Sequence, residues 1–333
     1  MLNSKFSLWY YLSRPQKERV KTSLFSTFAF LFSGNPKYEH WKGSRRFINE
    51  SLKRKLFNRF FIFSKSSYQW AFPTLTPTQN PAPIENVAVH IHVYYVDIFA
   101  KILHQLKNSG LPQLTLYITC QEEIASKTEE LMTPTGMNNK IYILPNRGRD
   151  LYPFLHVLPD LLSSGCSLIL KLHTKKSTHL KGTRIWLDDI LNKLTQPNQV
   201  VKILKLMEHY PEIGLIGPEE HVLPVYLYYG ENAITLSALC EKMGLPDKDS
   251  GQLHFVGGTM FFARPEALKP LMDLNLTLED FEKENGQLDG TMAHAMERMV
   301  GASVVKAGMV IADTGSELND VHFTVQTSYA FAR

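Results

Sequence analysis

Two short basic segments carry side chains that could bind an anion. Residues 146–150, Asn-Arg-Gly-Arg-Asp, combine a turn with two guanidinium groups ahead of an expected helix start. Residues 171–176, Lys-Leu-His-Thr-Lys-Lys, combine three ammonium groups with an imidazole and a hydroxyl. Guanidinium groups, ammonium groups and the N–H groups of a helix N-terminus all suit phosphate oxygens. We interpret both segments as anion-binding loops. A plain turn with Asp150 as the helix N-cap and a solvated basic loop are the structural alternatives.

A carboxylate that could accept a proton stands at Asp289, where a helix is expected to begin. His294 and Arg298 follow it, four residues apart and therefore on one face of that helix. Asp289 could also be the helix N-cap, and an N-cap can still point its carboxylate into a cleft. Gly257 and Gly258 precede an apolar run, which permits close approach of a ligand or simply close packing.

Two histidines, His90 and His92, alternate within the apolar and β-branched residues 87–95. Both rings are therefore expected on one face of a strand, with Tyr94 near the end of the run. Two histidines half-buried against a helix are the simpler interpretation. A metal pair would need a third ligand, for which the sequence offers no clear candidate.

The segments that must position these residues alternate between strand and helix patterns. Strands are predicted at 87–95, 114–119, 141–144 and 167–172, with later candidates at 213–216, 255–262 and 303–310. Helices are predicted at 98–106, 121–132 and 151–162. This alternation predicts an α/β fold with a mostly parallel sheet between helices. Ligands bind beyond the carboxyl ends of such strands, and the basic segments follow strands directly.

Together these segments resemble the rhamnan synthesis protein F family, bacterial polysaccharide-assembly proteins regarded as glycosyltransferases. The resemblance runs from about residue 87 to residue 301. Its markers are residues 146–150, residues 171–176, Gly-Leu-Ile-Gly-Pro at 214–218, the Gly257-Gly258 strand ending in Arg-Pro-Glu at 264–266, and Gly-Gln-Leu-Asp-Gly at 286–290. Several markers in the expected order are specific for the family, and much less specific for a substrate.

The order of the markers also resembles a diverged inverting GT-A glycosyltransferase, with a Rossmann-like sheet. In that group an Asn-x-Gly turn follows the third strand, a glycine pair opens a later strand, an acidic residue at a helix start is the base, and an arginine follows. The matching positions are, in the same order, Asn146 with Gly148, Gly257 with Gly258, Asp289, and Arg298.

One marker departs from that group. Where an Asp-x-Asp should bind a metal and the donor diphosphate, residues 171–176 offer no carboxylate. Hard divalent cations need oxygen ligands, so no metal is expected at this position. Lysine could instead neutralise a departing diphosphate directly. An Asp-Lys-Asp does occur at residues 247–249, but out of order and in a loop flanked by Pro and Gly. Magnesium or manganese elsewhere stays open.

The resemblance implies transfer of a sugar such as rhamnose from a nucleotide diphosphate donor, for example dTDP-rhamnose, to a lipid-linked glycan of a cell-surface polysaccharide or lipopolysaccharide. Asp289 would be the base. The donor-binding residues would be His90, His92, Tyr94, Asn146, Arg147, Gly148, Arg149, Asp150, Lys171, His173, Thr174, Lys175 and Lys176. The acceptor pocket would include Gly257, Gly258, Gln287, His294 and Arg298.

Two other functions are weighed against this one. A Rossmann-type dehydrogenase is disfavoured, because no Gly-x-Gly-x-x-Gly follows the first strand. A non-catalytic polysaccharide-assembly module that keeps the glycosyltransferase fold stays open, because the Asp-x-Asp is missing.

The N-terminal part of the chain differs in charge from the rest. Residues 1–70 carry fourteen Lys and Arg against three acids, interleaved with aromatic residues, although the whole chain has a net charge of only +4. A proline-rich stretch follows, which predicts a basic, helical extension at 1–71, a linker at 72–84 and a glycosyltransferase domain at 85–333. The extension could dock on that domain or lie on a membrane surface. Nucleic-acid binding is disfavoured, because no recognisable nucleic-acid module follows.

The expected location is the cytoplasmic face of the bacterial inner membrane. No apolar run reaches the ~20 residues that a membrane-spanning helix needs, and no compact signal peptide is evident. Three scattered cysteines fit a reducing compartment and argue against a disulfide framework. A lipid-linked acceptor favours peripheral membrane contact through residues 1–70.

Overall fold

The computed structural model describes residues 67–71, 75–175, 183–245, 253–287 and 289–326. All of them belong to one of the two compact units of the chain, Ser64–Arg333. Lys176, the Asp-Lys-Asp sequence at 247–249 and most of the basic extension lie outside the described residues.

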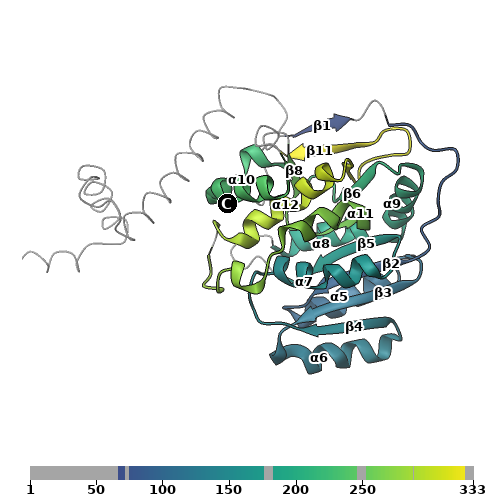
Figure 1. The fold of residues 1–333 in the computed structure, drawn as a ribbon. Helices are drawn as coiled ribbons and strands as arrows, with labels where there is room; N and C mark the ends of the chain where they lie inside the picture. Colours follow the sequence, from purple (N-terminus) through teal and green to yellow (C-terminus); the bar gives the residue numbers. More distant parts are fainter. Residues whose placement is uncertain (1–66, 72–74, 176–182, 246–252, 288, 327–333) are drawn as a thin grey trace, which may run out of the picture. The chain divides into compact units, whose positions relative to one another are not determined.

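A seven-stranded sheet forms the centre of this unit, with the strand order β10-β6-β9-β5-β2-β3-β4 (Figure 1). All neighbouring strands are parallel except β9, which is antiparallel to both β5 and β6. The strands are β2 (Val87–His92), β3 (Leu114–Cys120), β4 (Asn138–Ile143), β5 (Leu168–His173), β6 (Ile213–Gly217), β9 (Phe261–Ala263) and β10 (Val310–Asp313). The predicted α/β class, with a mostly parallel, Rossmann-like sheet, is confirmed.

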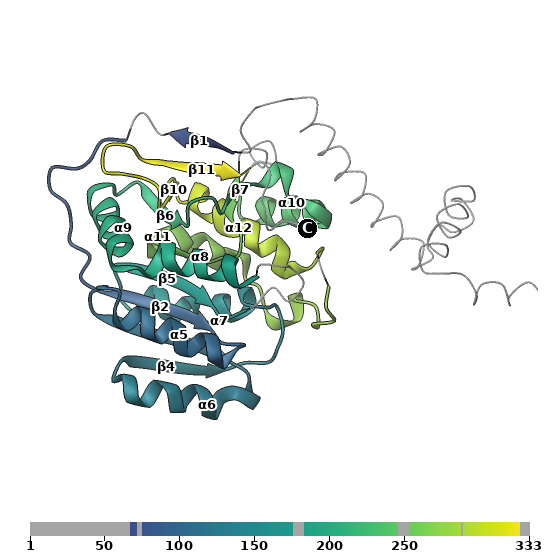
Figure 2. The same cartoon turned by 180° about the vertical axis from the view of Figure 1, so that it is seen from behind.

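Helices cover both faces of the sheet, as the two opposite views show (Figures 1 and 2). One face carries α5 (Val96–Lys107), α6 (Glu122–Met132), α8 (Thr183–Thr195) and α9 (Pro197–His209). The other carries α7 (Leu151–Ser163), α11 (Pro265–Leu268) and α12 (Met292–Lys306), and α10 (Ala233–Lys242) packs on α12. Each face has its own apolar core. Because β2 and β5 are buried along their whole length, their sequences are nearly continuous apolar runs.

The helices predicted after the first three strands are confirmed as α5, α6 and α7. Pro159 lies inside α7 without ending it. The helices α8 and α9 were not predicted. Short 3-10 helices lie at Thr133–Thr135, Val225–Leu227, Gly230–Asn232, Lys269–Leu274 and Leu278–Asp280.

The strand predicted at 255–262 is wrong, because it is two strands in two sheets. β8 (His254–Val256) belongs to a four-stranded sheet with the order β1-β11-β7-β8, whereas β9 belongs to the main sheet. Gly258 and Thr259, both with positive φ, turn the chain between them. The other strands of the smaller sheet are β1 (Ser67–Ala71), β7 (Val222–Pro224) and β11 (His322–Gln326).

The strand predicted at 303–310 is also wrong, because α12 continues to Lys306 and β10 starts only at Val310. Packing outweighs the β-branched residues of this stretch. α12 crosses β8 so closely at Gly301 that a Cβ there would overlap the carbonyl oxygen of His254.

The predicted linker is described from residue 75 onwards and has neither helix nor strand up to β2. β1, just before it, pairs with β11 of the same unit. The predicted domain boundaries stay a prediction. Within the described residues, no helix combines the length and the apolar character that crossing a bilayer requires.

Candidate functional site

The connections of the chain diverge beyond the carboxyl ends of the central strands β2 and β5. The chain leaves β2 toward β3 and β4 on one side, and α7 then returns it to β5 on the other side of β2. Connections that diverge in this way leave an opening beyond the strand ends, where α/β proteins bind ligands. The basic segments after β4 and β5 border this opening.

A buried ion pair joins these two segments beneath the opening. Lys171 of β5 is fully buried, and its Nζ donates to Asp150 Oδ2 (2.6 Å), to the carbonyl of Thr259 (3.0 Å) and to its hydroxyl (2.9 Å). The Thr259 hydroxyl in turn donates to Asp150. Burial alone would raise the pKa of the Asp150 carboxyl. The charges of Lys171 and then His173 outweigh this effect, so the pKa lies well below its usual value. The pair is therefore charged, and it binds α7 and the β8–β9 turn to β5.

This geometry gives Lys171 and Asp150 a structural role, and their predicted contact with the donor stays a prediction. An ammonium group has three N–H donors, and the three of Lys171 are all used inside the protein. Asp150 is the residue before α7, as predicted for an N-cap, but its side chain makes no capping hydrogen bond. Both residues position the turns around the site. Two residues beside this ion pair have left-handed backbones, which non-glycine residues rarely adopt. They are Arg149 (φ 55°), which precedes Asp150, and Thr259 (φ 53°), which bonds to Lys171 and Asp150.

The rings of His90 and His92 lie on one face of β2, as predicted, and both bond to the hydroxyl of Thr119 on β3. The distances are 3.1 Å from His90 Nε2 and 3.0 Å from His92 Nδ1. His90 is fully buried against Phe154, and its Nδ1 has no hydrogen-bond partner among the described residues. Burial lowers the pKa of His92 to about 3 and that of His90 well below its usual value. His90 is thus a neutral core residue, and its predicted contact with the donor stays a prediction.

His173 holds the glycine turn. Its Nδ1 accepts from the backbone N–H of Lys175 (3.2 Å), so Nε2 carries the proton that it donates to the Gly258 carbonyl (2.8 Å). Burial lowers the pKa of this ring to about 4. Trp186 of α8 stacks on the ring and fills the space where a Cβ of Gly258 would lie. The predicted close packing at Gly258 is therefore with a side chain. Gly257 is buried and donates to the His221 carbonyl (2.8 Å).

Two other predicted donor-binding side chains are used elsewhere. The Arg147 guanidinium donates to the carbonyls of Phe281 (2.5 Å) and Glu279 (3.4 Å). The Thr174 hydroxyl accepts from the backbone N–H groups of Tyr94 (2.7 Å) and Tyr95 (2.8 Å). Both side chains fasten loops, and their predicted role in donor binding stays a prediction. Asn146 is exposed and lines a small hollow of about 210 Å³ with residues from α6. At Gly148, a Cβ would overlap Tyr152 and Phe281, so the turn admits only glycine.

Two cations, Arg149 and Lys175, remain available at the opening. Arg149 Nη2 donates to the Gln287 carbonyl, but its Nε is buried without a hydrogen-bond partner, and the nearest carboxylate is Glu284 at 3.9 Å. The Lys175 ammonium has no hydrogen-bond or ion-pair partner within the described part of the chain. Burial, and next the charge of Arg149, lower the pKa of Lys175. An anion between these groups would relieve that repulsion.

Helix α12 brings the remaining polar groups to this opening. Arg298 Nη1 donates to the His294 carbonyl (2.6 Å) and to Glu297 Oε2 (2.9 Å), and its Nη2 donates to the Tyr228 carbonyl (2.9 Å). Glu297 Oε1 accepts from the Gly258 N–H (2.9 Å). The predicted pair is thus linked by a hydrogen bond from the Arg298 side chain to the His294 backbone carbonyl. The Arg298 guanidinium also lies over the ring of Phe255.

The start of α12 differs from the prediction for Asp289. The N-cap is Thr291, which forms a capping box with His294: the His294 ring accepts from the Thr291 backbone N–H (3.4 Å). The Thr291 hydroxyl also bonds to the Nδ1 of that ring (2.7 Å). Burial lowers the pKa of His294 to about 3. The carboxylate of Asp289 reaches across to the segment before α10, where it accepts from the Glu231 N–H (3.0 Å) and the Asn232 amide (2.6 Å). Its predicted role as the base stays a prediction.

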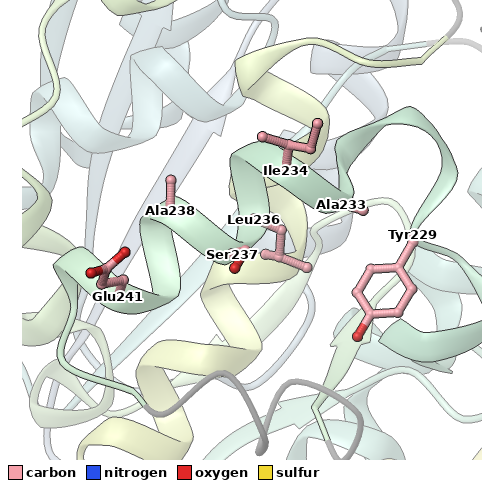
Figure 3. Close-up of a pocket in the computed structure, with 7 residues that line it drawn as sticks. All are labelled: Tyr229, Ala233, Ile234, Leu236, Ser237, Ala238 and Glu241. Atoms are coloured by element: carbon pink, nitrogen blue, oxygen red, sulfur yellow. The ribbon is translucent and has the colours of Figure 1, made fainter.

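A larger hollow, of about 510 Å³, lies beside α10 (Figure 3). Figure 3 shows Tyr229 and Glu241 at opposite ends of it, with Leu236 and Ser237 between them. Its lining has a carboxylate and no cation among the described residues, so this hollow does not suit a diphosphate.

The sequence interpretation missed Thr259 and Glu297. Thr259 follows the glycine pair and carries no charge, so nothing in the sequence distinguishes it. Glu297 lies three residues after His294 and therefore on the same face of α12, a spacing that could have drawn attention to it.

Comparison with known proteins gives a matching family and several similar proteins. The model of a family described as rhamnan synthesis protein F matches residues 67–309. Two proteins called uncharacterized protein WxcX, from Xanthomonas campestris pv. campestris strains B100 and ATCC 33913, are each 37% identical over 248 residues. The match covers 74% of this chain and 35% of each relative, so the chain spans about a third of their length. A mycobacterial protein of known crystal structure has 15% identity, covering 78% of this chain and 93% of its own, with a TM-score of 0.37.

The family match begins at the start of β1 and ends just before β10, and it contains every described residue at the opening. It thus reaches further toward the N-terminus than the resemblance in the sequence, which began near residue 87. The family is described by its part in the synthesis of rhamnan, a polysaccharide. This chain belongs to the rhamnan synthesis protein F family.

Proposed function

We propose that this chain is a glycosyltransferase that takes a sugar from a nucleotide diphosphate donor and adds it to a growing bacterial polysaccharide. Its family membership supports the polysaccharide, and its Rossmann-like sheet supports a nucleotide at the carboxyl edge. The observation that carries the proposal is the pair of cations at that edge: Arg149, whose Nε has no hydrogen-bond partner among the described residues, and Lys175 beside it.

The charge of these two groups suits a diphosphate. Arg149 offers a buried, unpartnered N–H, and Lys175 offers a partly buried ammonium beside it. Charge-assisted hydrogen bonds to phosphate are strong where water is partly excluded. When the sugar leaves the diphosphate, negative charge grows on the bridging phosphate oxygen. Fixed cations stabilise that charge and can replace the metal of an Asp-x-Asp site.

The acceptor side of the reaction needs a proton acceptor. As the acceptor oxygen forms its bond to the anomeric carbon, a carboxylate takes the hydroxyl proton, in a direct displacement that inverts the anomeric centre. Asp289 is the residue that the family motif suggests. Rhamnose as the sugar, a lipid-linked glycan as the acceptor and peripheral membrane contact through residues 1–70 are further parts of the proposal.

Lys175→Met is expected to weaken donor binding about tenfold to a hundredfold, because it removes one charge-assisted contact to the diphosphate, worth about 1.5–3 kcal/mol. Titration calorimetry with dTDP-, UDP- and GDP-sugars on wild type and variant measures it. Lys127→Met, the same substitution on the exposed surface of α6, is the control and should bind like wild type.

Two outcomes would count against the proposal. Equal affinity of wild type and Lys175→Met for the donor would mean that the diphosphate lies elsewhere. If no nucleotide sugar binds to the wild-type protein, the non-catalytic assembly module becomes the better account of the fold.

A further inference from the structure

Two carboxylates near α12 differ in how their oxygens are used. Both oxygens of Asp289 accept hydrogen bonds from the segment before α10. Oδ2 accepts from the Glu231 N–H, and Oδ1 accepts from the Asn232 amide. Burial would raise the pKa of this carboxyl, but the Asn232 amide and then the Glu231 N–H outweigh it and lower it. A carboxylate with a lowered pKa is a weaker base. Asp289 is built as an anchor for the 230–232 segment.

Glu297 also accepts one hydrogen bond at each oxygen, but its partners are the β8–β9 turn and Arg298 of α12. Its Oε1 accepts one hydrogen bond from the Gly258 N–H and its Oε2 accepts one from Arg298, both at 2.9 Å. These two contacts fix the orientation of the carboxylate, and each oxygen keeps a further lone pair. The side chain is 19% exposed.

The surroundings of Glu297 place it beside the diphosphate position. Glu297 interacts electrostatically with charged groups from four parts of the chain. They are Arg298 on α12, Lys171 on β5, Lys175 after β5, and Arg149 with Asp150 before α7. Burial raises the pKa of the Glu297 carboxyl in spite of Arg298. A base works best when its pKa is close to the working pH. Glu297 therefore combines fixed geometry, partial exposure and basicity next to the cations that would hold the leaving group.

We propose that Glu297 is the catalytic base, an assignment that rests on the glycosyl transfer proposed above. The acceptor oxygen forms a bond to the anomeric carbon, and the bond from that carbon to the diphosphate oxygen breaks. The leaving nucleoside diphosphate keeps the electron pair, next to Arg149 and Lys175. The acceptor's proton passes to a Glu297 oxygen and from there to water. Asp289 positions the segment that borders this site.

The test uses the full chain and hydrolysis of the donor, in which water takes the place of the acceptor and needs the same base. Glu297→Gln keeps an oxygen for the Gly258 N–H but removes the basic group. The rate at which nucleoside diphosphate is released from the bound donor is expected to fall at least about 100-fold, because general base catalysis contributes about 10²–10⁴-fold. The Kd for the donor should change less than about threefold. Glu297→Asp should recover part of the rate and move the acidic limb of its pH profile, which a merely structural residue would not do.

Asp289→Asn separates the two carboxylates. Its expected effect is a lower melting temperature, with residual donor hydrolysis that follows the fraction of folded protein. If Glu297→Gln hydrolyses the donor within threefold of wild type, or if Asp289→Asn alone abolishes hydrolysis in a folded, donor-binding protein, the assignment to Glu297 is wrong. If wild type itself neither binds nor hydrolyses any donor, the proposed function fails and the assignment falls with it.

Discussion

Lys171→Met is expected to lower the free energy of unfolding by about 3–5 kcal/mol, because it leaves the buried carboxylate of Asp150 without its counter-ion. The Lys171 ammonium is fully buried and donates to three oxygens, and methionine would supply none of these contacts. The variant also releases the left-handed Thr259 and the turn that carries Gly258. Urea unfolding followed by circular dichroism measures the loss.

Two controls make this prediction specific. Lys101→Met breaks the ion pair with Asp188, whose side chains are 43% and 46% exposed, and should cost at most about 1 kcal/mol. Asp150→Asn added to Lys171→Met removes the unpaired charge and should restore a large part of the stability. Equal losses for Lys171→Met and Lys101→Met would show that the buried pair does not hold the site together.

Acid is expected to destabilise the protein strongly between pH 6.5 and pH 4. Burial lowers the pKa of His92 to about 3 and that of His173 to about 4, from an ordinary value of 6.5 in the unfolded chain. In this pH window the two histidines bind protons in the unfolded chain but stay neutral in the folded protein. The free energy of unfolding that they contribute is therefore fully present above pH 6.5 and is lost as pH falls. At ~1.4 kcal/mol per pH unit and proton, each histidine accounts for about 2–3 kcal/mol by pH 4.5.

Urea unfolding at pH 7, 6 and 5 measures this loss. His173→Gln can keep the bond to the Gly258 carbonyl but has no group that titrates. The free energy of unfolding of this variant should therefore fall less steeply as pH decreases, because one fewer proton is bound on unfolding. His104→Gln, on an exposed position of α5, is the surface control. A slope that is the same in wild type and His173→Gln would contradict the buried, neutral state of His173. Asp150 has a lowered pKa as well, so its share of the stability is lost only in stronger acid.

Local patterns were sufficient for the central strands of the sheet and for the helices that follow the first strands. The apolar spacing of Ile98, Phe99 and Leu106 predicted α5, and the buried runs of β2 and β5 predicted the central strands. These patterns depend on residues near in sequence. The opening itself was predictable because basic residues follow β4 and β5 directly, and strand ends meet at one edge of a parallel sheet.

The use of each polar side chain was not predictable, because it depends on partners far along the chain. Lys171 looks like a surface cation in the sequence, yet it pairs with Asp150 and Thr259, 21 and 88 residues away. Arg147 lies in the same turn as Arg149, two residues before it, but the carbonyls of Phe281 and Glu279 take up its guanidinium. The division of residues 255–262 between two sheets depends on the backbone of Gly258 and Thr259 in the same way.

The claim at the centre of this account is that Arg149 and Lys175 hold the diphosphate in place of a metal. Calorimetric titration of the wild-type protein with the best donor of the panel, in EDTA and then in manganese, tests it most directly. The account predicts binding in EDTA, with a Kd that manganese changes less than about twofold and that added salt weakens. Binding that appears only with manganese would contradict it and would mean that a metal site holds the donor.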